Sequence, residues 1–76
     1  MVNYMSKWNG TLVDDWTPYI GHRVLVRKGG FNVYVIEVIV LEVSPAGMVK
    51  LRYQSGTIGW EESDDYLLRE DLGEVL

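Results

Sequence analysis

The feature that most constrains the fold is a long apolar stretch in the middle of the chain, Val33–Val43. β-Branched residues dominate it, and they pack well on the pleated surface of a sheet but lose rotamer freedom in a helix. Turn-forming residues flank the stretch, so the sequence predicts a β-strand. Such a strand is buried on both faces or bends at the corner of a small barrel, because both faces are apolar: Tyr34, Ile36, Val38 and Val40 on one side, Ile39 and Leu41 on the other.

The residues after this strand predict a tight hairpin. In Ser44-Pro45-Ala46-Gly47, Pro45 has the fixed φ of a type I turn, and Gly47 can take the left-handed conformation that follows it. Together they predict a three-residue bulged loop closed by Ser44 and Met48. This loop is predicted to pair Val43 with Val49, Leu41 with Leu51 and Ile39 with Tyr53 on one face, and Glu42 with Lys50 and Val40 with Arg52 on the other.

A second hairpin is predicted immediately after the first. Ser55-Gly56 has the composition of a two-residue turn, which places Tyr53 opposite Ile58 and Leu51 opposite Trp60. Three strands then share one apolar face, and Trp60 lies in the core. The sequence therefore predicts a three-stranded meander at the centre of the fold.

A shorter strand is predicted before the apolar stretch. Arg23–Arg27 alternates, with Val24 and Val26 on one face, and Gly21 marks its start. The next residues, Lys28–Asn32, contain a glycine pair beside a lysine, as phosphate-binding loops do. No helix is predicted after them, so a plain flexible loop is favoured.

The C-terminal third is acidic. Glu61–Asp65 suits a single helical turn, and its four carboxylates would suit a hard cation, but the EF-hand spacing is absent and a solvated turn is favoured. The adjacent pair Asp14-Asp15 is not expected to bind metal either, because neighbouring carboxylates point in different directions. A closing strand is predicted over 66–68, and residues 70–76 are expected to be a frayed turn or a tail.

The N-terminal residues allow two interpretations. Asn9-Gly10 is a hairpin turn signal, which Lys7-Trp8 and Thr11–Val13 would flank as short strands. Alternatively, the segment is an irregular arm whose large apolar side chains pack on the barrel: Trp8, Leu12 and Trp16. We therefore divide the chain into an N-terminal arm over 1–18, a barrel over 19–69 and a C-terminal tail over 70–76.

The length and composition limit what the chain can be. Seventy-six residues form one domain near the lower limit for a self-supporting core, and 47% apolar residues with three Trp and five Tyr compensate by packing large side chains. The chain has no cysteine, so no disulfide is available. The N-terminus lacks a basic region followed by an apolar stretch, and no run is long enough to span a membrane. We expect a cytoplasmic protein.

The charge is unevenly distributed along the chain. The formal net charge is −4, which argues against a general nucleic-acid binder. Residues 21–54 hold five basic and two acidic side chains, a balance of +3. Residues 55–76 hold one basic and seven acidic side chains, a balance of −6. Such polarity can orient a partner.

Taken in order, these elements resemble a five-stranded SH3-like barrel, and within that group the chain is similar to Tudor- and chromo-type domains. The resemblance covers about residues 19–69. It rests on Gly21-His22-Arg23-Val24-Leu25-Val26, on Val49-Lys50-Leu51-Arg52-Tyr53-Gln54-Ser55-Gly56, and on Trp60 followed by Asp64-Asp65-Tyr66-Leu67-Leu68.

The resemblance carries two functional implications. A Tudor-type domain binds methylated lysine or arginine in an aromatic cage through cation–π contacts, and the corresponding residues here are Phe31, Tyr34, Tyr53 and Trp60. Many SH3-like barrels of this size are instead subunits or accessory domains of larger assemblies, including phage and viral ones.

Enzymatic activity is not expected. His22 is the single histidine, the chain has no cysteine, and no nucleophile motif is present. General acid–base chemistry would have to come from carboxylates alone. We therefore predict no catalytic residue, no metal ligand, no cofactor and no small-molecule substrate.

A non-enzymatic protein-binding module or assembly subunit is the function that the sequence favours, because the chain has more apolar surface than one small core needs. A protein partner or a second copy is expected to contact Trp8, Trp16, Tyr19, Phe31 and Tyr34. The alternative is a nucleic-acid-binding barrel in which Phe31 or Tyr34 stacks on a base and basic residues contact phosphates: Arg23, Arg27, Lys28, Lys50 and Arg52. A contiguous basic face would support the alternative, whereas interleaved Glu37 and Glu42 would oppose it.

Overall fold

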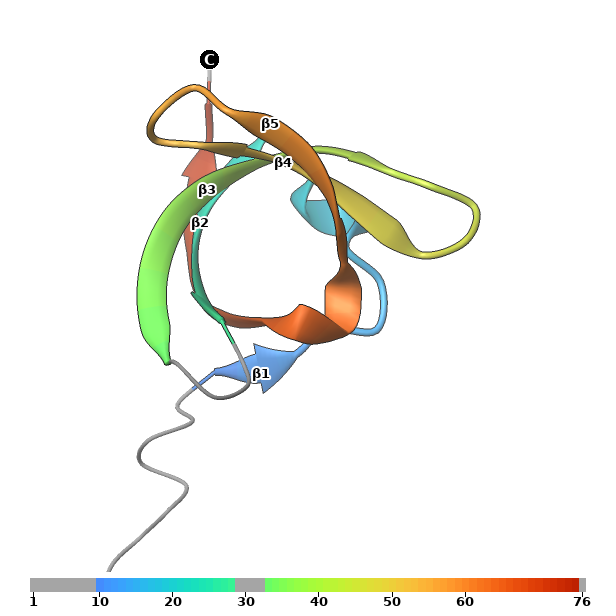
Figure 1. Ribbon diagram of the computed structural model, residues 1–76, viewed down its shortest axis with the longest axis horizontal. Coiled ribbons are helices and arrows are strands. Elements are labelled where there is room, and N and C mark those ends of the chain that lie inside the picture. The colour runs from blue at the N-terminus through green and yellow to red at the C-terminus, as the bar shows by residue number, and fades with distance from the viewer. Residues whose placement is uncertain (1–9, 29–32, 76) are drawn as a thin grey trace, which may run out of the picture.

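The structure, a computed structural model, describes residues 10–28 and 33–75 and shows an all-β fold, as predicted. Six strands form one antiparallel sheet in the order β1-β6-β2-β3-β4-β5 (Figure 1). The 3₁₀ turn η2 (Thr17–Tyr19) precedes β2, and a second one, η3 (Ser63–Asp65), joins β5 to β6. The strands are β1 (Thr11–Leu12), β2 (His22–Lys28), β3 (Tyr34–Val43), β4 (Met48–Tyr53), β5 (Ile58–Glu62) and β6 (Tyr66–Glu74).

The sheet curls strongly around its apolar core, and η3 carries the chain across from β5 to β6 (Figure 1). The prediction of five strands in a closed barrel differs from this arrangement. There are six strands in the described part of the chain, and the edge strands β1 and β5 are not paired with each other there. The core consists of Trp16, Val24, Val26, Val38, Val40, Val49, Leu51 and Tyr66.

The first hairpin has the predicted loop. The Ser44 N–H donates to the Met48 carbonyl at 2.8 Å, and the Gly47 N–H donates to the Ser44 carbonyl at 2.9 Å. Gly47 has a φ of 87°, in the left-handed region that a glycine enters without steric cost. Val43 pairs with Val49 and Glu42 pairs with Lys50, as predicted.

Beyond these two pairs the predicted register is wrong. A β-bulge interrupts β3 between Val40 and Glu42, so that Val40 pairs with Leu51 and Ile39 with Arg52. An extra residue in one strand shifts the register by one. Each side chain beyond it then lies on the opposite face of the sheet from the one predicted. Val38 and Val40 therefore lie in the core at 1% and 0% exposure, while Ile39 and Leu41 are only half-buried.

The second hairpin is also one residue out of the predicted register. The Tyr53 N–H donates to the Thr57 carbonyl at 2.8 Å, and Gly56, with a φ of 92°, donates to the Tyr53 carbonyl at 2.9 Å. This is the bulged three-residue loop of the first hairpin, not a two-residue turn. It places Ile58 opposite Arg52 and Trp60 opposite Lys50. The prediction that Trp60 lies in the core is therefore wrong, and 43% of this residue is exposed.

The N-terminal strand β1 pairs across the molecule with β6. Thr11 and Leu12 pair with Leu68 and Leu67 of β6, and a side chain at Gly10 would place its Cβ 2.6 Å from the Leu67 Cβ. Lys7 and Trp8 lie outside the described residues. The arm contributes Trp16 to the core, whereas Leu12, which was expected to pack, is 53% exposed.

The end of the chain is more ordered than predicted. The single helical turn predicted over Glu61–Asp65 is confirmed for Ser63–Asp65 (η3), whereas Glu61 and Glu62 belong to β5. β6 continues to Glu74, where a frayed turn or tail was expected. Glu74 pairs with His22, and the Val75 N–H donates to the Gly21 carbonyl at 2.8 Å. No helix in the described ranges is long and apolar enough to cross a membrane.

Replacing Gly47 by valine is expected to destabilise the protein. The substitution forces a β-branched residue into a left-handed conformation, which costs about 1–2 kcal/mol of the free energy of unfolding. Urea denaturation of Gly47→Val beside Ala46→Val, in the same loop, measures the effect. Equal midpoints for the two variants would contradict the loop geometry.

The two described tryptophans are expected to respond in opposite ways to truncation. Trp16 is 1% exposed, so Trp16→Ala should remove about 3–5 kcal/mol of stability and leave a chain of this size largely unfolded. Trp60 is 43% exposed, so Trp60→Ala should cost less than about 1 kcal/mol. Thermal unfolding followed by circular dichroism separates the two variants. A large loss of stability in Trp60→Ala would contradict the exposed position of Trp60.

Candidate protein-binding surface

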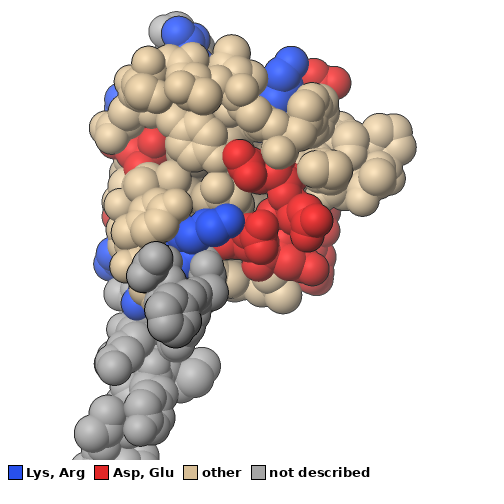
Figure 2. Space-filling model, viewed as in Figure 1, with Lys and Arg blue, Asp and Glu red and all other residues tan. Residues whose placement is uncertain are grey.

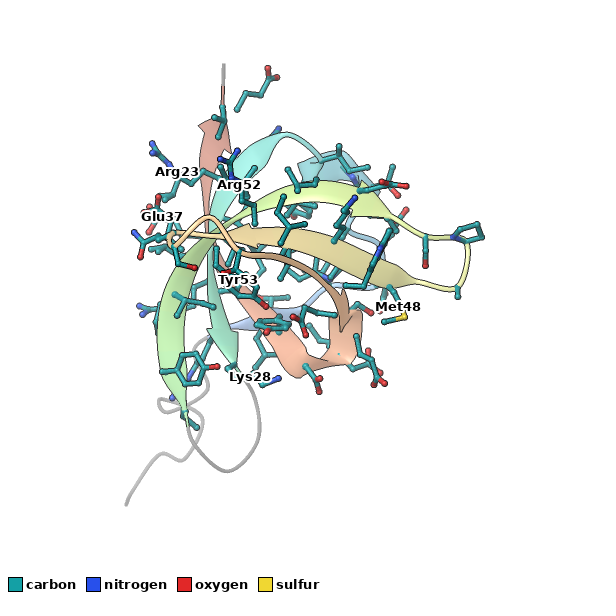
Figure 3. All side chains as sticks on the ribbon, turned by 45° about the horizontal axis from the view of Figure 1, so that its top comes forward. Arg23, Lys28, Glu37, Met48, Arg52 and Tyr53 are labelled. Carbon is teal, nitrogen blue, oxygen red and sulfur yellow. The ribbon has the colours of Figure 1, made fainter. Side chains whose placement is uncertain are left out.

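The outer side of the second hairpin presents a mixed apolar and charged surface. The cross-strand pairs Met48–Glu62, Lys50–Trp60 and Arg52–Ile58 place one set of side chains on the side of the sheet away from Val49 and Leu51. Met48 and Arg52 mark the two ends of this surface along β4 (Figure 3). We name it the β4–β5 face, and it consists of Met48, Lys50, Arg52, Ile58, Trp60 and Glu62.

Two large apolar side chains lie exposed on this face. Ile58 is 51% exposed and Trp60 43% exposed, two positions apart on β5. The Lys50 ammonium lies 5.7 Å from the centre of the Trp60 ring, within the range of a cation–π contact. Lys50 also lies 3.9 Å from a carboxylate oxygen of Glu42. The aromatic ring is thus held beside charged groups at the surface, an environment typical of interface tryptophans.

A hollow of about 350 Å³ adjoins this face at the Arg52 end. It is lined by Arg23 and Glu37, which form an ion pair at 3.4 Å, and by Gln54 and Gly56 of the second loop. Arg23, Glu37 and Arg52 lie at the same end of the sheet in Figure 3. Within the described ranges Arg52 has no carboxylate partner. The hollow therefore contains the guanidinium of Arg52, which has no such partner in these ranges, beside the Arg23–Glu37 ion pair.

The five basic residues proposed for nucleic-acid binding do not form one face. Arg23, Lys50 and Arg52 lie on the outer side of the sheet, where Glu37 and Glu42 pair with the first two. Arg27 is 8% exposed and so is not part of a free surface.

Lys28 lies on the opposite side of the sheet, because it follows Arg27 on β2. Its ammonium lies 4.8 Å from the centre of the Tyr66 ring and 3.5 Å from a carboxylate oxygen of Asp65. Burial disfavours the charged form, but the interactions with Tyr66 and Asp65 outweigh it and raise the pKa of Lys28. Figure 2 shows Asp and Glu side chains gathered where β5 runs into η3. The cation is thus held in acidic surroundings.

The aromatic residues predicted to bind a partner differ in how far their side chains are exposed. Trp16 is buried at 1% exposure, so it stabilises the core and cannot contact a partner. Tyr19 is half-buried and packs edge-on against Trp16, with ring centres 5.7 Å apart. Tyr34 is 46% exposed at the start of β3. Trp8 and Phe31 lie outside the described residues.

The aromatic cage implied by the family resemblance does not form from the β4 and β5 residues. Tyr53 lies on the inner side of the sheet, opposite Val38, whereas Trp60 lies on the outer side. The Tyr53 hydroxyl donates to Glu61 at 2.7 Å and lies 2.9 Å from the Tyr66 hydroxyl. Burial first, and these hydrogen bonds second, raise the pKa of Tyr53 far above its ordinary value. Tyr53 therefore links β4, β5 and β6 as a neutral phenol.

A further polar contact between distant segments joins His22 to Asp71. The His22 Nδ1 lies 2.9 and 3.0 Å from the two carboxylate oxygens, and the Gly73 N–H donates to the same carboxylate at 2.8 Å. The bond from Gly73 and then the one from His22 lower the pKa of Asp71. Residues 10–28 and 33–75 contain no group of three or more His, Cys, Asp or Glu side chains that could hold a metal ion.

Sequence reasoning missed Ile58, Trp60 and Glu62 as surface residues. The sequence held a signal for the second loop type: Gly56 occupies the third position of its loop, as Gly47 does in the first hairpin. The same loop type in both hairpins sets the register that places these residues on the surface. A comparison of the chain with protein-family models, with curated proteins and with solved structures finds no match. The assignment of a function therefore rests on the geometry of the surface.

The lowered pKa of Asp71 predicts a pH-dependent contribution to stability. A carboxyl group whose pKa is lower in the folded state stabilises the fold above its unfolded pKa of about 3.9, and this contribution is lost as the pH falls through the folded value. Asp71→Asn should therefore melt below the parent at pH 7. The difference should disappear in acid, below both pKa values.

Asp64→Asn is the matched control, since no hydrogen bond to the Asp64 carboxylate is found in the described residues. It should melt with the parent at each pH. A constant gap between Asp71→Asn and the parent from pH 7 to acid would contradict the role assigned to the carboxylate.

Proposed function

We propose that the chain is a non-enzymatic protein-binding module or assembly subunit that binds through the β4–β5 face. The observation that carries the proposal is the exposure of Ile58 and Trp60, at 51% and 43%, side by side on an edge strand. Leaving apolar surface in water costs about 25 cal/mol of free energy per Å². A partner that covers these side chains removes this cost. Tryptophan and arginine are also the residues most enriched at the energetic centres of protein interfaces.

The arrangement of the face suits protein recognition. Its apolar pair is bordered by Lys50 and Arg52 on one strand and by Glu62 at the end of the other. A protein interface typically has such an apolar centre with a polar rim. The hollow beside Arg52 adds a concave feature into which a partner side chain fits.

The strand order supports an SH3-like barrel as the scaffold of this module. The five longer strands follow the order β6-β2-β3-β4-β5 in a curled antiparallel sheet, and a 3₁₀ turn lies between the fourth and fifth of them in the chain. In this proposal β1 is an addition to the edge formed by β6. Barrels of this kind use exposed faces and edges to bind other chains, so the scaffold and the proposed role agree.

One observation favours nucleic acid as a second candidate partner. Trp60 lies opposite Lys50 and diagonally from Arg52 of β4, and an exposed aromatic ring beside Lys and Arg can stack on a base. The surrounding charge weighs against it. The carboxylates of Glu37, Glu42 and Glu62 balance the outer-face cations of Arg23, Lys50 and Arg52, and phosphate binding needs a surplus of positive charge.

The proposal is tested by capturing partners with the intact chain. Affinity-tagged parent and Trp60→Ser are incubated with a lysate of the native host, and bound proteins are quantified by mass spectrometry. A specific partner should be retained by the parent and reduced about tenfold or more by the variant, since interface tryptophans commonly contribute over 2 kcal/mol.

Leu72→Ser serves as the control, because Leu72 is a similarly exposed apolar residue on β6. It should retain the partner. Identical protein profiles for all three baits would contradict the proposal. Retardation of single-stranded DNA or RNA by the parent at low salt, lost in Lys50→Glu with Arg52→Glu, would favour the nucleic-acid alternative instead.

A further inference from the structure

We infer that the β4–β5 face receives a second copy of this chain, through antiparallel pairing of the two β5 strands about a two-fold axis at Trp60. The inference rests on the proposed function and names the partner of that face. It follows from the free edge of β5, from the register that a two-fold axis imposes, and from the charges that this register brings together.

The free edge of β5 carries a row of unpaired backbone groups. Tyr53 and Thr57 form the bonded pair that closes the loop, so the alternation of antiparallel pairs directs the backbone groups of Gly59 and Glu61 toward β4. Those of Ile58, Trp60 and Glu62 are directed away from it. Within residues 10–28 and 33–75, β5 pairs with β4 alone. The outward N–H and C=O groups can therefore form ladder hydrogen bonds with another strand.

β5 carries few of the features that keep edge strands from pairing. It has no proline, no lysine and no bulge, and its outer side chains include the exposed Ile58 and Trp60. Its one inward-pointing charge, Glu61, is engaged by the Tyr53 hydroxyl at 2.7 Å. A free edge of this kind is a template for strand addition.

A two-fold axis at Trp60 gives a self-consistent register. Trp60 lies opposite its own copy, and Ile58 lies opposite Glu62 of the other chain, in both directions. All three positions are ones whose backbone groups face the free edge, so each pair is a bonded pair. On the outer face the two Trp60 rings become direct cross-strand neighbours, an arrangement that stabilises antiparallel sheets.

The same register is complementary in charge. Arg52 pairs with Ile58, and Ile58 would face Glu62 of the second copy, so the guanidinium and that carboxylate are two strands apart, about 10 Å between Cα atoms. Both side chains are long enough to meet over Ile58. Neither has an ion-pair partner within the described chain. Symmetry produces this contact twice, so the dimer pairs two cations and two carboxylates that the single chain leaves in water.

The inner face of the paired strands is more crowded than the outer face. Gly59 would lie opposite Glu61 of the second copy. A Cβ at residue 59 would come 3.3 Å from a carboxylate oxygen of Glu61 in its own chain, so this side of β5 has little room for a second side chain. The two Glu61 carboxylates would come close together on this face, and the two outer-face ion pairs have to outweigh this like-charge contact.

The test is a charge exchange measured by sedimentation equilibrium on the full chain. The parent should dimerise with a Kd below about 1 mM. Arg52→Glu and Glu62→Arg, each alone, place like charges together twice and should weaken dimerisation about tenfold or more. The double variant restores opposite charges and should recover most of the parent affinity. Arg69→Glu, with the same change in charge on β6, should dimerise like the parent.

Each result supports or overturns the inference. A parent that stays monomeric at about 1 mM overturns it, as do single variants that dimerise like the parent. A double variant as weak as the single ones overturns the proposed register. Circular dichroism at low concentration confirms that the exposed-site variants are folded. If a Trp60-dependent partner is captured from the lysate while the chain is monomeric, the proposed function stands and this inference alone fails.

Discussion

The register of two hairpins determines which side chains this small protein buries and which it displays. Gly47 and Gly56 each occupy the third position of a bulged loop with φ near +90°, and each loop fixes the pairing of the strands beside it. Because the side chains of a strand alternate between two faces, a shift of one residue would exchange Val49 and Leu51 for Lys50 and Arg52 in the core. The burial of the apolar residues in β4 therefore requires Trp60 on the outside.

A sheet that is open at its edges needs contacts across the gap, and here side chains supply them. Tyr53, Glu61 and Tyr66 connect β4, β5 and β6 through hydroxyl and carboxylate groups, at distances of 2.7 and 2.9 Å. Below them Trp16 fills the core from a segment outside the longer strands. A chain of this length buries only about 60% of its unfolded surface, so a few large side chains have to supply much of the stabilisation.

The sequence predicted the all-β class, the entry strand, the first loop and the turn before β6, because local residues decide each of these. Pro45 and Gly47 leave one loop type available, whereas Ser55-Gly56 fits both a two-residue turn and the end of a longer loop. The bulge in β3 was not predictable, because a strand that is apolar on both faces accepts either register. The pairing of β6 as far as Glu74 depends on contacts with β2, which no local pattern reveals.

The distribution of charge supports the proposal that two copies meet at the β4–β5 face. Each chain carries a net charge of −4, and many of its carboxylates gather near η3, so most approaches of one copy to another are repulsive. The β4–β5 face carries Lys50 and Arg52 against Glu62, and Glu42 lies 3.9 Å from Lys50, so this surface has no surplus of carboxylates. Long-range repulsion thus disfavours contacts at the acidic end and is weaker at this face. The exposed apolar pair and the free backbone groups of β5 lie at this same place, so electrostatics, apolar burial and backbone pairing favour one surface.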